Sequence, residues 1–127
     1  MIIKPNPVNW FEIPVSDMPR AIKFYESAFD VQLTQTLVEP FELAMFPVDP
    51  HGPGAGGALI HSPPITPSHL GTTVYFSVVS IDPVLERIGA AGGKTLLPRR
   101  SIGQYGFIAQ FEDSEGNRVA LHEMAKS

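Results

Sequence analysis

The residues best suited to chemistry in this chain of 127 lie on three extended segments. Residues 9–17 read NWFEIPVSD, and in a strand the side chains of Trp10 and Glu12 would point to the same face. The opposite face, which should pack on the helix, would then carry Phe11, Ile13 and Val15. Partial desolvation of Glu12 against the indole would make the carboxylate a general base. Tyr75 or His122, on two other predicted strands, could then polarise an oxygen of a bound molecule.

A structural interpretation of the same residues is equally open. A half-buried Glu12 could pair with Arg118, with His122 or with backbone groups, because buried charges in proteins normally find such partners. The arginine doublet Arg99–Arg100 could reach an anionic ligand or lie in solvent. Residue types alone do not decide between a catalytic site, a binding site and a structural pair.

The elements that must position these residues occur twice in the same order. A helix is predicted over 16–30, because Pro19 suits a first turn and apolar residues recur at helical spacing, and strands follow over 31–40, 41–48 and 56–62. The second half repeats the order with a strand, a helix and three strands over 72–80, 80–93, 94–98, 105–113 and 117–123.

The two halves can be aligned residue by residue. Val15 falls on Val78 and Tyr25 on Ile88, while AMF (44–46) falls on AQF (109–111) and ALI (58–60) on ALH (120–122). We therefore predict one α+β domain over 1–127, built of two tandem βαβββ modules (about 7–62 and 72–124) and a linker (about 62–71). Each module should form a curved, four-stranded, half-barrel sheet backed by a helix.

Composition narrows the classes of partner. The net charge of −4 argues against nucleic acid, whose phosphates require clustered Lys and Arg, and the absence of cysteine excludes thiolate chemistry. We see no secretory signal and no run of about 20 apolar residues, so we expect a cytoplasmic protein without a membrane partner.

Three stretches carry a family resemblance over nearly the whole chain: IPVSDMPRAIKFYESAF (13–29), AGGK (91–94) and FEDSEGNRVALHE (111–123). Together with the internal repeat they resemble the vicinal-oxygen-chelate superfamily of glyoxalase I, bleomycin-resistance proteins and extradiol dioxygenases. The last stretch has Ser114 where the family motif usually has proline. The resemblance implies the glyoxalase/bleomycin-resistance fold, a cleft at the concave faces of the sheets, and a homodimer.

The resemblance also implies one metal ligand on each of four strands, normally His or Glu. The corresponding positions here are Trp10, Ala58, Thr73 and Ala120. None of these side chains suits Zn²⁺, Ni²⁺ or Fe²⁺. We therefore expect no cofactor, and a divalent metal only at positions displaced by two residues, with Glu12 and His122 as ligands.

Strand alternation then predicts the lining of the cleft. Candidate catalytic residues are Glu12, Tyr75 and His122, and candidate ligand-binding residues are Trp10, Ala58, Ile60, Thr73, Ser77, Arg118 and Ala120. The Gly/Pro-rich loop before residue 58 and IGQYG (102–106) are candidate lids over the cleft.

Three functions remain. The first is metal-independent binding of a small molecule. The second is an enzyme of the lyase, isomerase or dioxygenase class that uses Glu12 as a base or as a displaced metal ligand. The third is a structural or regulatory dimer without a ligand. We rank binding slightly ahead of catalysis, because the expected metal ligands are missing.

Overall fold

A computed structural model describes residues 2–126 and shows the same element order in both halves. The predicted architecture of two βαβββ modules is confirmed. Module one contains β1 (Trp10–Pro14), α1 (Met18–Phe29), β2 (Thr34–Val38), β3 (Phe41–Met45) and β4 (Gly56–His61). Module two contains β5 (Tyr75–Ser77), α2 (Ile81–Ala90), β6 (Lys94–Ser101), the 3₁₀ turn η1 (Gly103–Tyr105), β7 (Phe107–Glu112) and β8 (Arg118–Glu123).

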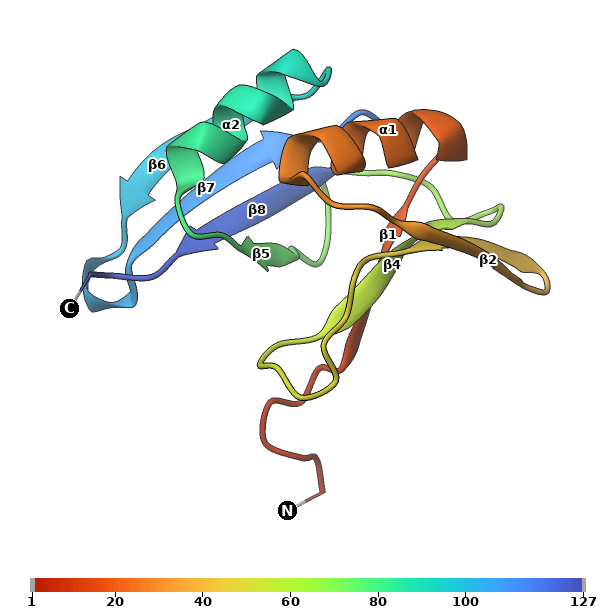
Figure 1. The fold of residues 1–127 in the computed structure, drawn as a ribbon, viewed down its shortest axis with the longest axis horizontal. Helices are drawn as coiled ribbons and strands as arrows, with labels where there is room; N and C mark the ends of the chain where they lie inside the picture. The colour runs from red at the N-terminus through yellow and green to blue at the C-terminus, as the bar shows by residue number, and fades with distance from the viewer. Residues whose placement is uncertain (1, 127) are drawn as a thin grey trace.

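Each module folds into its own four-stranded sheet. The strand orders are β1-β4-β3-β2 and β5-β8-β7-β6, and β1 and β5 each run parallel to their single neighbour. The register places Glu12 opposite Ala58 and Tyr75 opposite Ala120, so these positions are equivalent in the repeat. Both helices lie side by side on one face of the sheets (Figure 1). The strands β1 and β5 are edge strands and belong to different sheets.

Local sequence signals explain the first helix. The Asp17 side chain accepts a hydrogen bond from the Arg20 N–H at 3.0 Å, and Pro19 occupies the first turn as predicted. The buried stripe consists of Met18, Ala21, Phe24, Tyr25 and Ala28. Phe24 belongs to this buried stripe, whereas Ile22 is only partly buried.

The second helix starts and ends differently. Ser80 makes no side-chain cap, and the Ile81 N–H instead donates to Glu123 Oε1 at 2.8 Å. The helix ends at Ala90, before the glycine pair expected to cap it, and Gly92 adopts a left-handed φ of 104° just beyond. Arg99 also donates two hydrogen bonds to Glu123. These bonds, first from Arg99 and then from Ile81, hold the pKa of the Glu123 carboxyl below its usual value.

The main core lies between the helices and the sheets. As predicted, Ile13 and Val15 are buried there and Phe11 packs against the cluster. A smaller apolar cluster on the other face of the first sheet holds Leu43, Ala58 and Ile60. The strand predicted over 72–80 is regular only at 75–77, and the strand predicted over 94–98 continues to Ser101. No helix among residues 2–126 is both long and apolar enough to cross a bilayer.

The turn at residues 113–117, between β7 and β8, fastens module two to module one. Glu115 Oε1 accepts the N–H groups of Ser16 and Asp17 at 2.9 and 2.8 Å. Arg20 Nε donates to Glu115 Oε2 at 2.7 Å, and Asn117 Nδ2 donates to the Pro14 carbonyl at 2.7 Å. This 113–117 turn thus covers the junction between β1 and α1.

Contacts at this turn shift the pKa values of Glu115 and of Tyr25. Burial alone would raise the pKa of the Glu115 carboxyl, but hydrogen bonds from Arg20, Asp17, Ser114 and Ser16 outweigh burial and lower it. Tyr25 donates to Asp113 Oδ2 at 2.6 Å, and its burial, followed by the Asp113 charge, raises the pKa of the phenol well above its usual value. The turn is therefore a polar contact between the modules, in which the covered Glu115 carboxylate meets exposed partners in module one.

Candidate functional site: the inter-module cleft

A cleft of about 1160 Å³ separates the two modules near the start of β1. It is lined by residues from both faces of the edge strands β1 and β5, so it passes across the gap between the two sheets. Binding pockets for small molecules usually enclose about 300–1,000 Å³. The inter-module cleft is therefore large enough for a drug-sized molecule.

Five polar or aromatic side chains predicted for the site line this cleft. They are Trp10 and Glu12 from β1 and Tyr75 and Ser77 from β5, joined by Thr73 just before β5. Trp10 and Tyr75 retain 41% and 48% of their accessible surface, so ring surface remains for contact with another molecule. The structure thus brings half of the predicted site residues together in one cavity.

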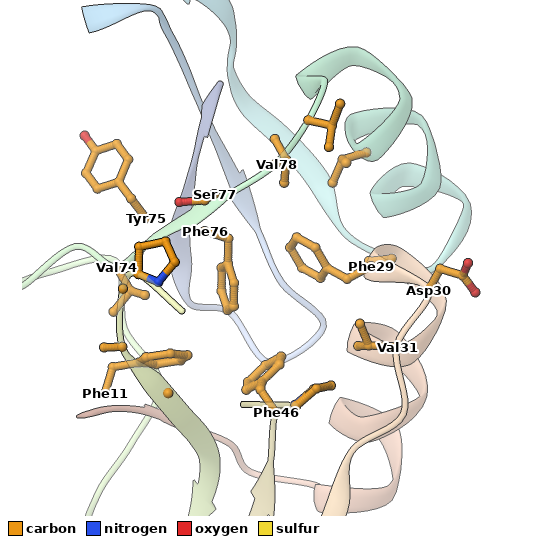
Figure 2. Close-up of a pocket in the computed structure, with 18 of the residues that line it drawn as sticks. Phe11, Phe29, Asp30, Val31, Phe46, Val74, Tyr75, Phe76, Ser77 and Val78 are labelled. Atoms are coloured by element: carbon orange, nitrogen blue, oxygen red, sulfur yellow. The ribbon is translucent and has the colours of Figure 1, made fainter. Parts of the chain in front are cut away.

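Four phenylalanines form the floor of the cleft on its helix side, namely Phe11, Phe29, Phe46 and Phe76. Their rings point toward one another, whereas Tyr75 points away from them (Figure 2). Phe76 is central: its ring centroid lies 4.8 Å from that of Phe29, 5.3 Å from Phe46 and 5.5 Å from Phe11. We call this group the phenylalanine floor.

The remaining predicted residues lie outside the cleft lining. Ala58 and Ala120 are fully buried, and Ile60 is packed in the smaller apolar cluster. Arg118 lines a separate pocket of about 130 Å³ together with Glu12 and donates to the His69 carbonyl at 3.0 Å. His122 Nε2 donates to the Tyr105 carbonyl at 2.6 Å, which ties η1 to β8.

Glu12 has a different partner from the one expected. It is exposed, and its carboxylate accepts a hydrogen bond from Trp10 Nε1 at 3.3 Å. Of the alternatives left open for Glu12, pairing with Arg118 or His122 is not observed: no hydrogen bond or ion pair joins these described residues to Glu12, and Arg118 Nε and His122 Nε2 donate to backbone carbonyls. The bond orients the indole along the strand and leaves the second carboxylate oxygen of Glu12 for another donor.

The residues present do not fit the metal site that the resemblance implies. Two of the four ligand positions, Ala58 and Ala120, carry buried methyl groups, and Trp10 and Thr73 do not supply imidazole or carboxylate. Among residues 2–126, no three His, Asp or Glu side chains are grouped closely enough to hold a cation. Glu12 and His122, the candidate displaced ligands, lie on β1 and β8 in different sheets, and His122 is outside the cleft lining.

Loops complete the cleft. Pro53, Gly54 and Ala55 of the Gly/Pro-rich loop line it, which agrees with the position expected for a loop at the mouth. At the other wall, Asp30 and Arg87 lie where α1 ends beside α2, and Arg87 donates to the Ser27 and Ala28 carbonyls. Arg99, a candidate contact for an anionic ligand, instead donates hydrogen bonds to Glu123. Its guanidinium carbon lies 3.6 Å from the centroid of the Phe107 ring.

Sequence reasoning missed the phenylalanine floor. Strand alternation assigned Phe11 to the face that packs on the helix, and this assignment is correct. The same ring also lines the cleft, because the edges of β1 and β5 are not paired with each other. One signal was available in the sequence: the loop between the third and fourth strands is longer in module one than the equivalent turn in module two.

Comparisons with solved structures confirm the fold. Glyoxalase I from Zea mays is 23% identical with a TM-score of 0.69; the match covers 92% of this chain but only 46% of the maize chain. TnmS3, an antibiotic binding protein from Streptomyces sp. CB03234, is 22% identical with a TM-score of 0.67 and coverage of 98% and 99%. A glyoxylase/bleomycin resistance protein/dioxygenase domain from Frankia sp. EAN1pec is 17% identical with a TM-score of 0.72 and coverage of 96% and 100%.

No curated protein matches the chain. The family model described as Glyoxalase/Bleomycin resistance protein/Dioxygenase superfamily matches residues 8–121, which is most of the sequence and includes both modules. Together with the two βαβββ modules, this match settles the resemblance first read from the sequence motifs. The chain belongs to the Glyoxalase/Bleomycin resistance protein/Dioxygenase superfamily.

Proposed function

We propose that the protein binds a small organic molecule in the inter-module cleft, without a metal at the positions that superfamily enzymes use. The observation that carries this proposal is the pair of half-exposed rings, Trp10 and Tyr75, lining a cavity of about 1160 Å³. Aromatic rings with free surface supply large contact areas with little loss of conformational freedom. Glu12 and Ser77 add hydrogen-bonding groups at the same rim.

The chemistry of the site supports binding more than catalysis. Glu12 is exposed, so it lacks the desolvation that a general base beside Trp10 requires. Two of the four positions that hold metal ligands in superfamily enzymes are alanines in this chain, Ala58 and Ala120. The likeness to TnmS3, an antibiotic binding protein that matches nearly full length, supports the same choice at the level of the fold.

Trp10 provides the assay, because it is the sole tryptophan of the chain. Addition of antibiotics or planar aromatic compounds should change the Trp10 emission with saturation at one ligand per cleft, and calorimetry should give the same Kd. The matched control combines Trp10→Phe with Leu37→Trp, which moves the indole to an exposed position on β2 outside the cleft lining. In this variant calorimetry should still detect binding, while emission should stay constant.

The metal part of the proposal is tested separately. Protein purified without chelator is analysed for zinc, nickel and iron, and ligand titrations are repeated with and without EDTA. Unchanged Kd values and substoichiometric metal would support the proposal. A stoichiometric metal whose removal abolishes binding would overturn it, as would the failure of every compound in a broad library to bind.

A further inference from the structure

The two ends of the module interface are built differently, although the modules repeat the same elements. At one end the 113–117 turn covers the β1–α1 junction: Glu115 accepts hydrogen bonds from two backbone N–H groups, and Asn117 donates one to a backbone carbonyl. The equivalent segment of module one, the loop at 47–55, should cover the β5–α2 junction. Within residues 2–126, this 47–55 loop makes no hydrogen bond to residues 78–81.

The aligned residues explain the difference. Asp113, which is 3% exposed, bonds to Tyr25 and to backbone groups of its own turn. In the repeat Val48 takes the place of Asp113 and Ile88 takes the place of Tyr25, so no polar pair can form at the second junction. Val48 is 63% exposed, and the 47–55 loop is longer than its counterpart. The space that a turn would fill is therefore open.

That open space is the inner part of the inter-module cleft. All four rings of the phenylalanine floor are only partly buried, so they present ring surface to the cavity. Val31 and Val84 form the adjacent wall beside α1 and α2. None of the four floor residues is charged; the charged side chains of the lining are Glu12 on β1, Asp30 at the end of α1 and Arg87 in the last turn of α2.

We propose that the cleft takes a flat, uncharged aromatic ring system, inserted across the unpaired edges of β1 and β5 until it lies on the phenylalanine floor. The polar end of the same molecule stays at the rim beside Glu12 and Ser77. Tilted and edge-to-face contacts already join the four rings, and a planar ligand extends this aromatic packing. This inference rests on the proposed function and names the ligand class and the position of the ligand's apolar part.

Two neutral alcohols serve as probes. 9-Anthracenemethanol is flat and fluorescent, and 1-adamantanemethanol carries the same polar group on a globular apolar body. The anthracene should bind with saturable change in its fluorescence, and the adamantane should displace it with a Kd at least tenfold weaker. Equal affinities for the two probes would overturn the requirement for a flat ring.

Variants then locate the ring. Val84→Trp places a large side chain in the cleft and should weaken anthracene binding at least tenfold, whereas Glu86→Trp, at an exposed position on the same helix, should leave the Kd within twofold. Circular dichroism and thermal melts verify that each variant folds. If Val84→Trp does not fold, Val31→Trp blocks the same space from the end of α1.

The outcomes separate this inference from the proposed function. If Val84→Trp and Val31→Trp bind normally while Trp10→Ala does not, the ligand lies on the concave side only, so the proposed function stands and the inference fails. If no compound binds at all, both fail. If anthracene binding competes with self-association in analytical ultracentrifugation, a second copy of the chain covers the floor, and this also overturns the inference.

Discussion

Glu115→Ala should be the most damaging change at the module interface. The Glu115 side chain is fully excluded from solvent, and its carboxylate accepts hydrogen bonds from two backbone N–H groups and from two nitrogens of Arg20. Hydrogen bonds to a charged group each contribute about 1.5–3 kcal/mol when protected from water. The Arg20 side chain is 54% exposed, so solvent screens its ion pair with Glu115 and the backbone bonds dominate.

Ser16 and Asp17 are exposed, so each of the two backbone bonds should contribute less than a fully protected one, about 1–2 kcal/mol, and the two together predict a loss of about 2–4 kcal/mol in the free energy of unfolding. For a chain of this length, that corresponds to a decrease of about 7–15 °C in Tm. The loss is measured by urea unfolding followed by circular dichroism, with Glu86→Ala as the control, because Glu86 is exposed on α2. The control should change stability by less than about 0.5 kcal/mol.

A third variant tests the reasoning itself. Arg20→Ala removes the ion pair and leaves the bonds from the backbone N–H groups of Ser16 and Asp17 to Glu115 in place, so it should cost less than Glu115→Ala. If Arg20→Ala is as destabilising as Glu115→Ala, the ion pair and not the backbone bonds fastens the modules. If Glu115→Ala behaves like the Glu86→Ala control, the turn does not fasten them at all.

Three further predictions concern protonation and packing. Glu115 and Glu123 have lowered pKa values in the folded protein, so the unfolded chain binds more protons in acid. The stability that these two carboxylates contribute should be complete above about pH 5 and should be lost as the pH falls below about 4. A free energy of unfolding in urea that stays constant from pH 5 to 3 would contradict this. The pKa of Tyr25 is raised, so the unfolded chain loses the phenol proton first and the free energy of unfolding should fall above about pH 10. Tyr25→Phe should remove this alkaline loss in thermal melts, and it should cost about 1–3 kcal/mol at neutral pH because the hydrogen bond to Asp113 is lost. Gly57→Ala would place a methyl group against the Phe11 ring and should cost about 1–3 kcal/mol, whereas Gly89→Ala, with open space on α2, should stabilise by about 0.5–1 kcal/mol. Equal Tm values for the two variants would refute the packing argument.

The order of elements could be predicted because it depends on local signals. Alternation placed Phe11, Ile13 and Val15 on the helix side, and the Asp17 cap with Pro19 fixed the start of α1. Those signals act over a few residues and do not depend on how the modules pack. The same property explains why the internal repeat was readable from the sequence.

The role of Glu115 could not be read in this way. In the sequence it is an acid in a turn, which is typical of a solvated residue, yet its partners lie about a hundred positions earlier in the chain. The floor of the cleft was hidden for a related reason. Whether a core-facing ring such as Phe76 is fully covered depends on the distance between two unpaired strand edges, and no local pattern encodes that distance.

The contrast between the two connecting segments has a consequence for engineering. A change in length at 113–117 would break the bonds that join the modules, so that turn should tolerate neither insertion nor deletion. The 47–55 loop is free of such bonds among the described residues, and doubling the length of a flexible loop costs only about 0.6 kcal/mol. It is therefore the natural graft point on this scaffold, where an added recognition peptide or fluorescent reporter would lie at the mouth of the cleft.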